Sequence, residues 1–210
     1  MSDEEKEDKG GERWEILFGI VLAIFAAALA ICDLGAGKYG DDEMIAVNDK
    51  AGAYLWYQSK GIKETLVEGQ ANFLTTMIES GAIAKSQVAA VQAEVDNLRD
   101  DADRYSKEKK EILVGSKGVG EANWMQDIDG EKGKVTGAKE FEARAAQLGE
   151  AGDVFDRGTL YLQMCLVLGA IGIIVRNERM KLVFFIAMLG LGILGSVYTH
   201  QAYQLAEKVG

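Results

Sequence analysis

Three segments of the chain are almost entirely apolar: residues 16–32, 160–175 and 182–197. None of them leaves the polar stripe that a helix of a soluble protein presents to water. At about 1.5 Å per residue, each segment with its flanks approaches the roughly 30 Å hydrocarbon core of a bilayer. A buried helix in a soluble core is the alternative at this length. We predict transmembrane helices over residues 14–34, 159–176 and 182–203.

The segment between the first two spans, residues 35–158, carries most of the charge and is rich in alanine, glutamate, lysine and glutamine, which favours helix. Glycines at 35, 37 and 40 predict a broken connector, and a first helix is predicted from about Asp42 to Ser80. Its apolar residues share one face, at Leu55, Ile62, Leu66, Phe73 and Met77. Ser80 and Gly81 predict the end of this helix or a kink in it.

Two further helices in this segment repeat apolar residues at alternating spacings of three and four, which is typical of coiled coils. In one, the repeat consists of Val88, Val91, Val95, Leu98, Ala102, Tyr105 and Ile112. In the other, it consists of Ala138, Phe141, Ala145, Leu148, Gly152 and Phe155, and it leads into the second span without a proline. Such narrow faces do not form an independent core, so the helices need partners, either each other or copies in an oligomer. We predict assembly roles for Val88, Val91, Val95, Leu98, Phe141 and Leu148.

A glycine-rich loop, residues 115–137, is predicted between these two helices, either as a functional or as a mobile segment. Its first residues lack the Gly-Lys-Ser/Thr ending of a phosphate-binding loop. The acidic turn at 127–131 has its glycine in the wrong register for an EF-hand. The acidic residues at 41–43 are expected to cap a helix start, and those at 100–103 to lie on a helix surface. The sequence therefore predicts no cofactor site and no metal site.

Composition narrows the classes of function. The formal net charge of −10 excludes a basic nucleic-acid-binding protein. The single histidine, His200, makes a catalytic triad or a multi-histidine metal centre improbable, and no paired nucleophile and base was found. Cys32 and Cys165 are expected to be buried thiols rather than a disulfide. The protein is therefore predicted not to be an enzyme and to have no catalytic residues.

Two polar features stand out beside or within the apolar segments. Tyr54, Trp56, Tyr57, Lys60 and Lys63 form an aromatic–basic patch within about two helical turns. Such a patch suits a lipid headgroup boundary, a contact between subunits, or helix packing within one chain. Within the second span, Gln163 is the one strongly polar side chain; it is a candidate for lining a pore, for an interhelical hydrogen bond, or for a site near the interface.

The distribution of lysine and arginine predicts the topology. The acidic tail predicted as disordered, residues 1–13, carries Lys6, Lys9 and Arg13, and the short basic turn predicted at 177–181 follows Arg176 and holds Arg179 and Lys181. We place both in the cytoplasm. Residues 35–158 and the tail 204–210 are then expected on the outer, periplasmic side of a bacterial inner membrane.

Two stretches resemble an uncharacterised bacterial membrane protein family, domain of unknown function 4337. Residues 48–63 resemble the aromatic Tyr-Gln-x-Lys-x-Ile-Lys helix that follows the family's first span, and Phe155-Asp156 resembles the approach to its last helical hairpin. The resemblance implies three spans flanking a helical segment, and it implies no activity.

Together these features predict an all-α integral membrane protein with three transmembrane helices flanking an extramembrane helical coiled-coil domain. We expect it to act as a non-catalytic oligomeric scaffold or adaptor of the bacterial envelope. The expected partners are membrane lipid, copies of the chain and other envelope proteins, and no nucleic acid. The alternative is a subunit of an oligomeric ion channel or transporter.

Overall fold

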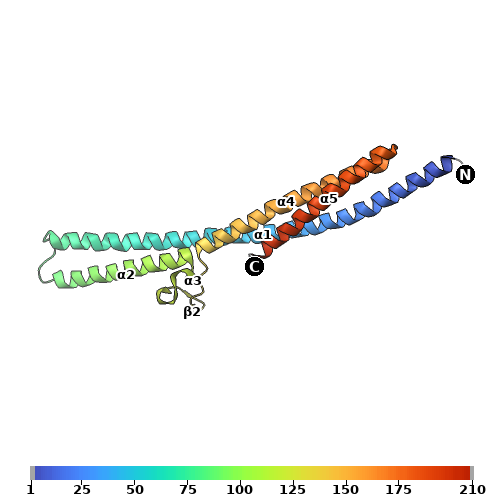
Figure 1. Ribbon diagram of the computed structural model, residues 1–210. Coiled ribbons are helices and arrows are strands. Elements are labelled where there is room, and N and C mark those ends of the chain that lie inside the picture. Colours follow the sequence, from blue (N-terminus) through green and yellow to red (C-terminus); the bar gives the residue numbers. More distant parts are fainter. Residues whose placement is uncertain (1–2, 209–210) are drawn as a thin grey trace. The chain divides into compact units, whose positions relative to one another are not determined.

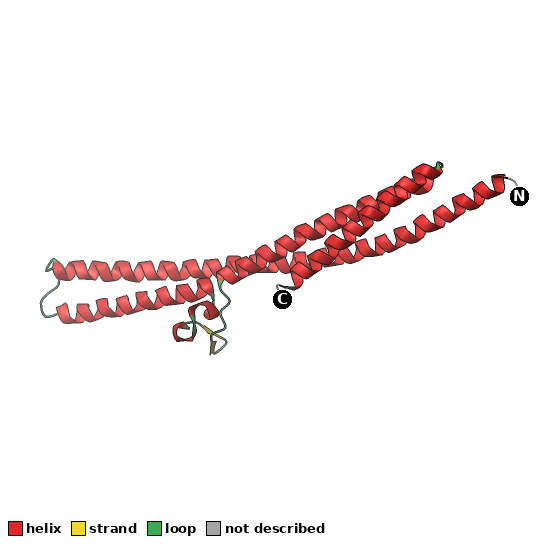
Figure 2. Cartoon of the chain, viewed as in Figure 1, coloured by secondary structure: helices red, strands yellow, loops and turns green. Residues whose placement is uncertain are grey.

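The computed structural model describes residues 3–208, with side chains from Arg13 onward, and these residues are almost entirely helical (Figures 1 and 2). The long helices are α1 (Asp3–Glu79), α2 (Val88–Val114), α4 (Ala138–Ile174) and α5 (Glu178–Glu207). Between α2 and α4 lie α3 (Ser116–Val119), the 3₁₀ helix η1 (Glu121–Asn123), and the antiparallel pair β1 (Asp127–Ile128) and β2 (Glu131–Lys132). The predicted all-α class is confirmed.

The chain divides into two compact units. The three-helix unit contains the described residues up to Met44 and those from Ala146 onward, and the hairpin unit contains Ile45–Ala145. The polar domain predicted over residues 35–158 therefore begins before the hairpin unit and ends after it. Three helices, namely α1, α4 and α5, are long and apolar enough to span a membrane, as predicted.

The predicted connector at residues 35–40 is wrong, because α1 is one uninterrupted helix of 77 residues. Glycine in a helix costs about 1 kcal/mol relative to alanine, and packing can offset that cost. At Gly35 a Cβ atom would lie 2.6 Å from the Tyr203 hydroxyl oxygen and 2.7 Å from the Phe155 ring. Gly35 therefore serves close packing, and the acidic residues at 41–43 lie inside α1 rather than capping a helix start.

The predicted basic turn at residues 177–181 is also wrong. The link between α4 and α5 is three residues long, from 175 to 177, and Glu178 already belongs to α5. Asn177 is the N-cap, because its side-chain oxygen accepts hydrogen bonds from the backbone amides of Arg179 and Met180. The basic residues after Asn177 therefore occupy the first turn of α5.

The chain ends are more helical than predicted. Met1 and Ser2 of the predicted disordered tail lie outside the described residues, and the backbone of α1 is helical from Asp3. At the other end, α5 extends to Glu207, so most of the described part of the predicted tail continues the helix.

The three-helix unit has an aromatic and aliphatic core. Phe18, Phe25, Phe155, Leu162 and Met188 are buried in it, together with Cys32, Cys165 and Ala202. Glycines of α4 and α5 lie against these side chains, and Figure 1 shows α5 running beside the end of α4. A Cβ atom at Gly195, for example, would lie 2.6 Å from Leu162. Both cysteines are free and buried, in agreement with the prediction.

In the hairpin unit, α1 and α2 are joined at Ser80–Gln87 and linked by side-chain contacts. Gly81 has a φ of +74° and its neighbour Ala82 donates a backbone hydrogen bond to Met77, which ends α1 where the sequence predicted. The repeat predicted for α2 is buried or half-buried throughout. The side of α1 that is covered within the hairpin unit carries small, polar and apolar residues together, and its half-buried or buried positions include Ala53, Tyr57, Lys60, Glu64, Val67, Ala71 and Leu74.

The glycine-rich segment 115–137 is folded around Glu111 of α2. The fully buried Glu111 carboxylate accepts hydrogen bonds from the Ser116 hydroxyl and from the amides of Met125 and Gln126, each at 2.7 Å. The indole of Trp124 donates to the Ser116 carbonyl at 2.8 Å. Asp129 and Gly130 both have positive φ and join β1 to β2. We call residues 115–137 with Glu111 the loop module.

Candidate assembly surface

The aromatic–basic patch of α1 is used mainly for packing inside the hairpin unit. The Tyr54 hydroxyl donates a hydrogen bond to Glu142 at 3.1 Å, and this bond raises the pKa of Tyr54 above its ordinary value. Lys60 forms an ion pair with the buried Glu108 of α2. Packing within one chain was one of the three interpretations that the sequence left open, and these contacts favour it.

The remaining members of the patch differ in their surroundings. Trp56 is half-buried and lines a mainly apolar groove of about 330 Å³ with Ile128, Val135 and Phe141. The ammonium group of Lys109 lies 5.7 Å from the centre of the Tyr57 ring. Lys63 is exposed. Most members of the patch therefore pack against other parts of the hairpin unit, and Lys63 is the exposed member.

A second ion pair across the hairpin joins Lys109 of α2 to Glu64 of α1. The hydrogen bond to Glu64 raises the pKa of Lys109, while partial burial acts in the opposite direction. Further along, Arg99 of α2 donates a long hydrogen bond to Thr75 of α1 at 3.4 Å. The two helices are thus linked by polar contacts that lie on one side of α1.

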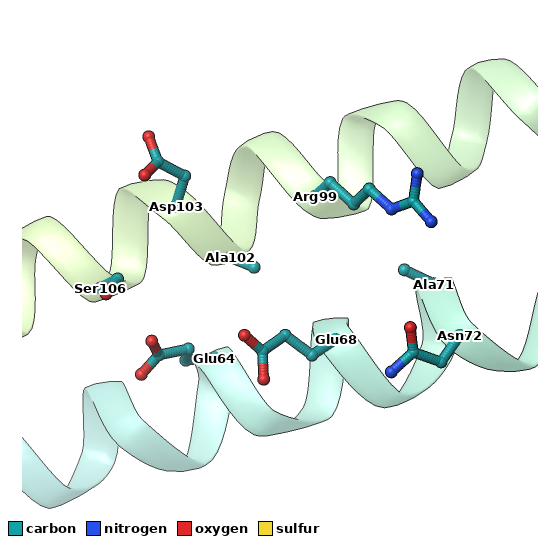
Figure 3. Close-up of a pocket in the computed structure, with 8 residues that line it drawn as sticks. All are labelled: Glu64, Glu68, Ala71, Asn72, Arg99, Ala102, Asp103 and Ser106. Carbon is teal, nitrogen blue, oxygen red and sulfur yellow. The ribbon is translucent and has the colours of Figure 1, made fainter.

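The contact between α1 and α2 also contains a polar hollow of about 540 Å³ (Figure 3). Ala71 and Ala102 lie on its facing walls, where their short side chains leave space between the helices. Its other lining residues are polar: Glu64, Glu68, Asn72, Arg99, Asp103 and Ser106. The hairpin therefore buries little large apolar surface along this stretch. Among the described residues, no group of three or more histidine, cysteine, aspartate or glutamate side chains is placed to hold a metal ion.

Four large apolar residues of α1 lie on the opposite side of the helix. Leu55, Ile62, Leu66 and Phe73 are 66%, 70%, 59% and 63% exposed, and we call these four residues the apolar row. Met77, the fifth residue of the predicted face, is half-buried. Contiguous exposed apolar side chains on a soluble surface mark an interaction site. The apolar row is the surface of the hairpin unit that is best suited to a partner.

The predicted assembly residues of α2 and α4 are less available. Val95 and Leu148 are buried, and Val88, Val91, Leu98 and Phe141 are half-buried within the single chain. Their apolar surface is already covered in large part. The row on α1 was visible in the sequence as a four-and-seven spacing, but nothing in that spacing showed that this face, unlike those of α2 and α4, is left uncovered.

Gln163 of α4 lies on the outside of the three-helix unit. It is exposed, and its neighbours on the same helical face are the exposed apolar residues Leu160, Met164, Val167 and Ile171. Inside the unit, the core residues fill the space between the helices. Gln163 is therefore presented outward rather than toward the core of its own chain.

Three candidate membrane helices and a polar helical hairpin define an all-α protein with the composition of a membrane protein. The chain belongs to the family described as Domain of unknown function (DUF4337), whose model matches residues 14–205. Comparison with the curated proteins and with the solved structures found no match. The family match covers both units and confirms the resemblance drawn from residues 48–63 and 155–156.

Proposed function

We propose that this protein is a non-catalytic, oligomeric membrane scaffold or adaptor. The three-helix unit anchors it in the bilayer, and the hairpin unit provides the surface on which other protein chains assemble. The observation that carries this proposal is the apolar row, four large side chains that remain mostly exposed on α1. Full burial of a Leu, Ile or Phe side chain contributes about 1.5–3 kcal/mol, so leaving four of them in water is costly without a partner.

The polar groups of the hairpin unit support a structural rather than a chemical role. Glu111 has hydrogen-bond partners inside the loop module, while Glu64 and Glu108 pair with lysines across the hairpin. Groups that are held in such pairs contribute to folding and are poorly placed to attack a substrate. We propose that copies of the chain and other envelope proteins are its partners, besides lipid.

We further propose that the protein resides in a bacterial inner membrane, with its N-terminus in the cytoplasm and residues 35–158 on the periplasmic side. Lysine and arginine at residues 6–13 and 176–181 support this orientation. A test is available at Lys117, which is exposed in the loop module. A membrane-impermeant thiol reagent should label Lys117→Cys in cells whose outer membrane is permeable to it. Labelling only after the inner membrane is lysed would reverse the orientation.

The scaffold proposal is tested by the mass of the full-length protein purified in mild detergent. We expect an oligomer whose mass, after subtraction of bound detergent, is an integral multiple of 22.8 kDa. We also expect the protein to remain in the membrane pellet after alkaline extraction, because its apolar helices need lipid. A monomer at all accessible concentrations would contradict the oligomeric scaffold, and release by alkali would contradict the membrane anchor.

A second candidate function, a subunit of an oligomeric channel or transporter, is favoured by one observation. Gln163 presents an amide on an otherwise apolar outer face of α4, where it could line a pore between chains. In this case Gln163→Leu should abolish conductance in planar bilayers. The control is Gln201→Leu, another exposed glutamine near the end of α5. Absence of conductance in the unmodified oligomer would exclude this alternative and leave the scaffold.

A further inference from the structure

Within the hairpin unit, α1 has two rows of positions, here called seams, on opposite sides of the helix. On α1, one set of positions covered within the hairpin unit recurs at alternating spacings of three and four from Ala53 to Leu74. A second set of positions has the same spacing but lies two residues later, at 55, 59, 62, 66, 69 and 73, and the apolar row occupies four of these six positions. At about 100° per residue, a shift of two residues places the second seam almost diametrically opposite the first. One seam is occupied by α2, and the other is uncovered.

We propose that the apolar row pairs with the same row of a second copy of this chain, with the two α1 helices parallel and in register. This inference rests on the proposed oligomeric scaffold and names its contact. Leu55, Ile62, Leu66 and Phe73 each meet the same residue of the second copy. The positions between them in the heptad are small, at Gly52, Ser59 and Gly69, which allows close approach of the two helices.

The charge distribution of α1 permits a second copy of the chain to approach along the row. The protein carries a formal net charge of −10, so two copies repel each other over most of their surfaces. The residues that flank the row carry no carboxylate: they are Gln58, Lys63, Thr65, Gln70 and Asn72. The row and its flanks therefore form the strip of α1 along which two copies can approach without repulsion between acids. In a parallel pair, Gln58 of one copy lies near Lys63 of the other.

The shape of the surface is self-complementary. Beside the row lies a mainly apolar groove of about 550 Å³, lined in part by Tyr57, Gly61, Ile62, Leu66 and Lys109. Gly61 has no side chain and so deepens the groove next to two protruding members of the row. The groove leaves room beside Ile62 and Leu66 for the side chains of a facing helix. A twofold axis presents the same protrusion and the same groove on both copies.

The direction of the pairing follows from the membrane. Residues 16–32, the apolar segment, and the row belong to one continuous helix, α1. All copies of one protein insert with the same orientation, so their α1 helices run in the same direction. A parallel arrangement is therefore the one that copies in the same membrane can form along this helix.

The row is long enough for a pair of helices to meet over several turns. It extends over 19 residues from Leu55 to Phe73, so its ends are about 27 Å apart along the helix. A pair would remove from water four large apolar side chains that are each 59–70% exposed in the single chain. Anchoring in a bilayer raises the local concentration of the partner, which favours association without further contacts.

Disulfide formation at two positions of the seam tests the inference. In a parallel, in-register pair, Ser59→Cys and Gly69→Cys should each form a disulfide-linked dimer rapidly under mild oxidation of the full-length protein in membranes. The matched control is Ser106→Cys, which is exposed on α2 and off the row. The unmodified chain serves as the blank, because Cys32 and Cys165 are both buried.

A charge placed in the row provides an independent measurement. Leu66→Lys should weaken self-association of the purified protein by more than tenfold, whereas Ser106→Lys should leave it unchanged. Because Leu66 is mostly exposed in the single chain, its variant should keep the helical circular dichroism of the unmodified protein.

The outcomes separate this inference from the proposed function. An oligomer in which Ser59→Cys and Gly69→Cys do not cross-link, or cross-link no faster than Ser106→Cys, would overturn the inference and leave the scaffold. Cross-linking at only one of the two positions would indicate helices that cross or run antiparallel and would also overturn it. A monomer, with lipid rather than a second copy covering the row, would overturn both proposals.

Discussion

Glu111 is predicted to hold the loop module together, and its removal should open that module without unfolding the rest of the chain. The carboxylate is fully buried at the end of α2 and accepts three hydrogen bonds at 2.7 Å. Two of the donors are backbone amides, of Met125 and Gln126, which have no other acceptor among the described hydrogen bonds. The third is the hydroxyl of Ser116, whose oxygen in turn accepts from the Val135 amide at 3.0 Å.

The size of the stability loss in Glu111→Ala depends on the buried hydrogen-bond donors that lose their acceptor. A buried donor without a partner costs about 1–3 kcal/mol, and three donors lose their acceptor at once. Part of this cost is offset because a buried carboxylate no longer has to be desolvated. We expect a net loss of about 3–5 kcal/mol in the stability of the loop module, which corresponds to a 100-fold or larger rise in its open population.

Hydrogen exchange measures this opening residue by residue. In Glu111→Ala, the amides of Met125, Gln126 and Val135 should exchange at least 100-fold faster, and trypsin should cleave the module after its exposed lysines. The amides of the three-helix unit should be unaffected, because the module lies in the other compact unit. Glu121→Ala is the matched control, since Glu121 belongs to the same module but is exposed.

The reasoning would be refuted by equal exchange in the Glu111→Ala and Glu121→Ala variants. It would also be refuted if Glu111→Ala unfolded the whole chain in one transition, because the effect should stay local. Glu111→Gln gives an intermediate case. Its side chain keeps one acceptor oxygen but replaces the other with a donor, so the opening should fall between those of the unmodified protein and Glu111→Ala.

Two further predictions concern packing and pH. Gly192→Ala should lower the melting temperature of the detergent-solubilised protein by several degrees, because its Cβ atom would overlap the ring of Phe25, whereas Gly190→Ala should be nearly neutral, since no atom lies within 4 Å. Equal effects of the two substitutions would contradict the observed packing. The raised pKa of Lys109 means that its pairing with Glu64 contributes fully below the ordinary lysine pKa and is lost as pH rises through the folded-state pKa. Stability should therefore fall more steeply above about pH 10.5 in the unmodified protein than in Lys109→Met, and parallel pH profiles would contradict this.

The pattern of apolar residues was sufficient to predict the main helices. The repeat from Val88 to Ile112 lies in α2, and the repeat from Ala138 to Phe155 lies in α4, which continues to Ile174 without a break, as the absence of proline suggested. Gly81 ends α1 with a positive φ, which glycine adopts without strain. Local chemistry decides features of this kind, so the sequence alone predicts them.

The predicted break near Gly35 failed because that position depends on contacts distant in sequence. Gly35 indicated a break, because glycine has a low helix propensity, yet its lack of a side chain makes room for Tyr203 and Phe155. In the loop module, the Asp129-Gly130 pair was a usable sign of a β-hairpin. Nothing comparable in the sequence indicated that Glu111 is buried, because a glutamate near the end of an amphipathic helix is ordinarily solvated.

The sequence by itself determined that the chain is helical, that three of its helices can cross a membrane, and where α2 and α4 carry their apolar faces. The tertiary structure decided which face of α1 meets α2. That helix has two seams with the same three-and-four rhythm, and periodicity alone cannot rank them. The covered seam combines apolar residues such as Val67 and Leu74 with two ion pairs to α2, formed by Lys60 and by Lys109, and the four residues of the apolar row remain on the outside.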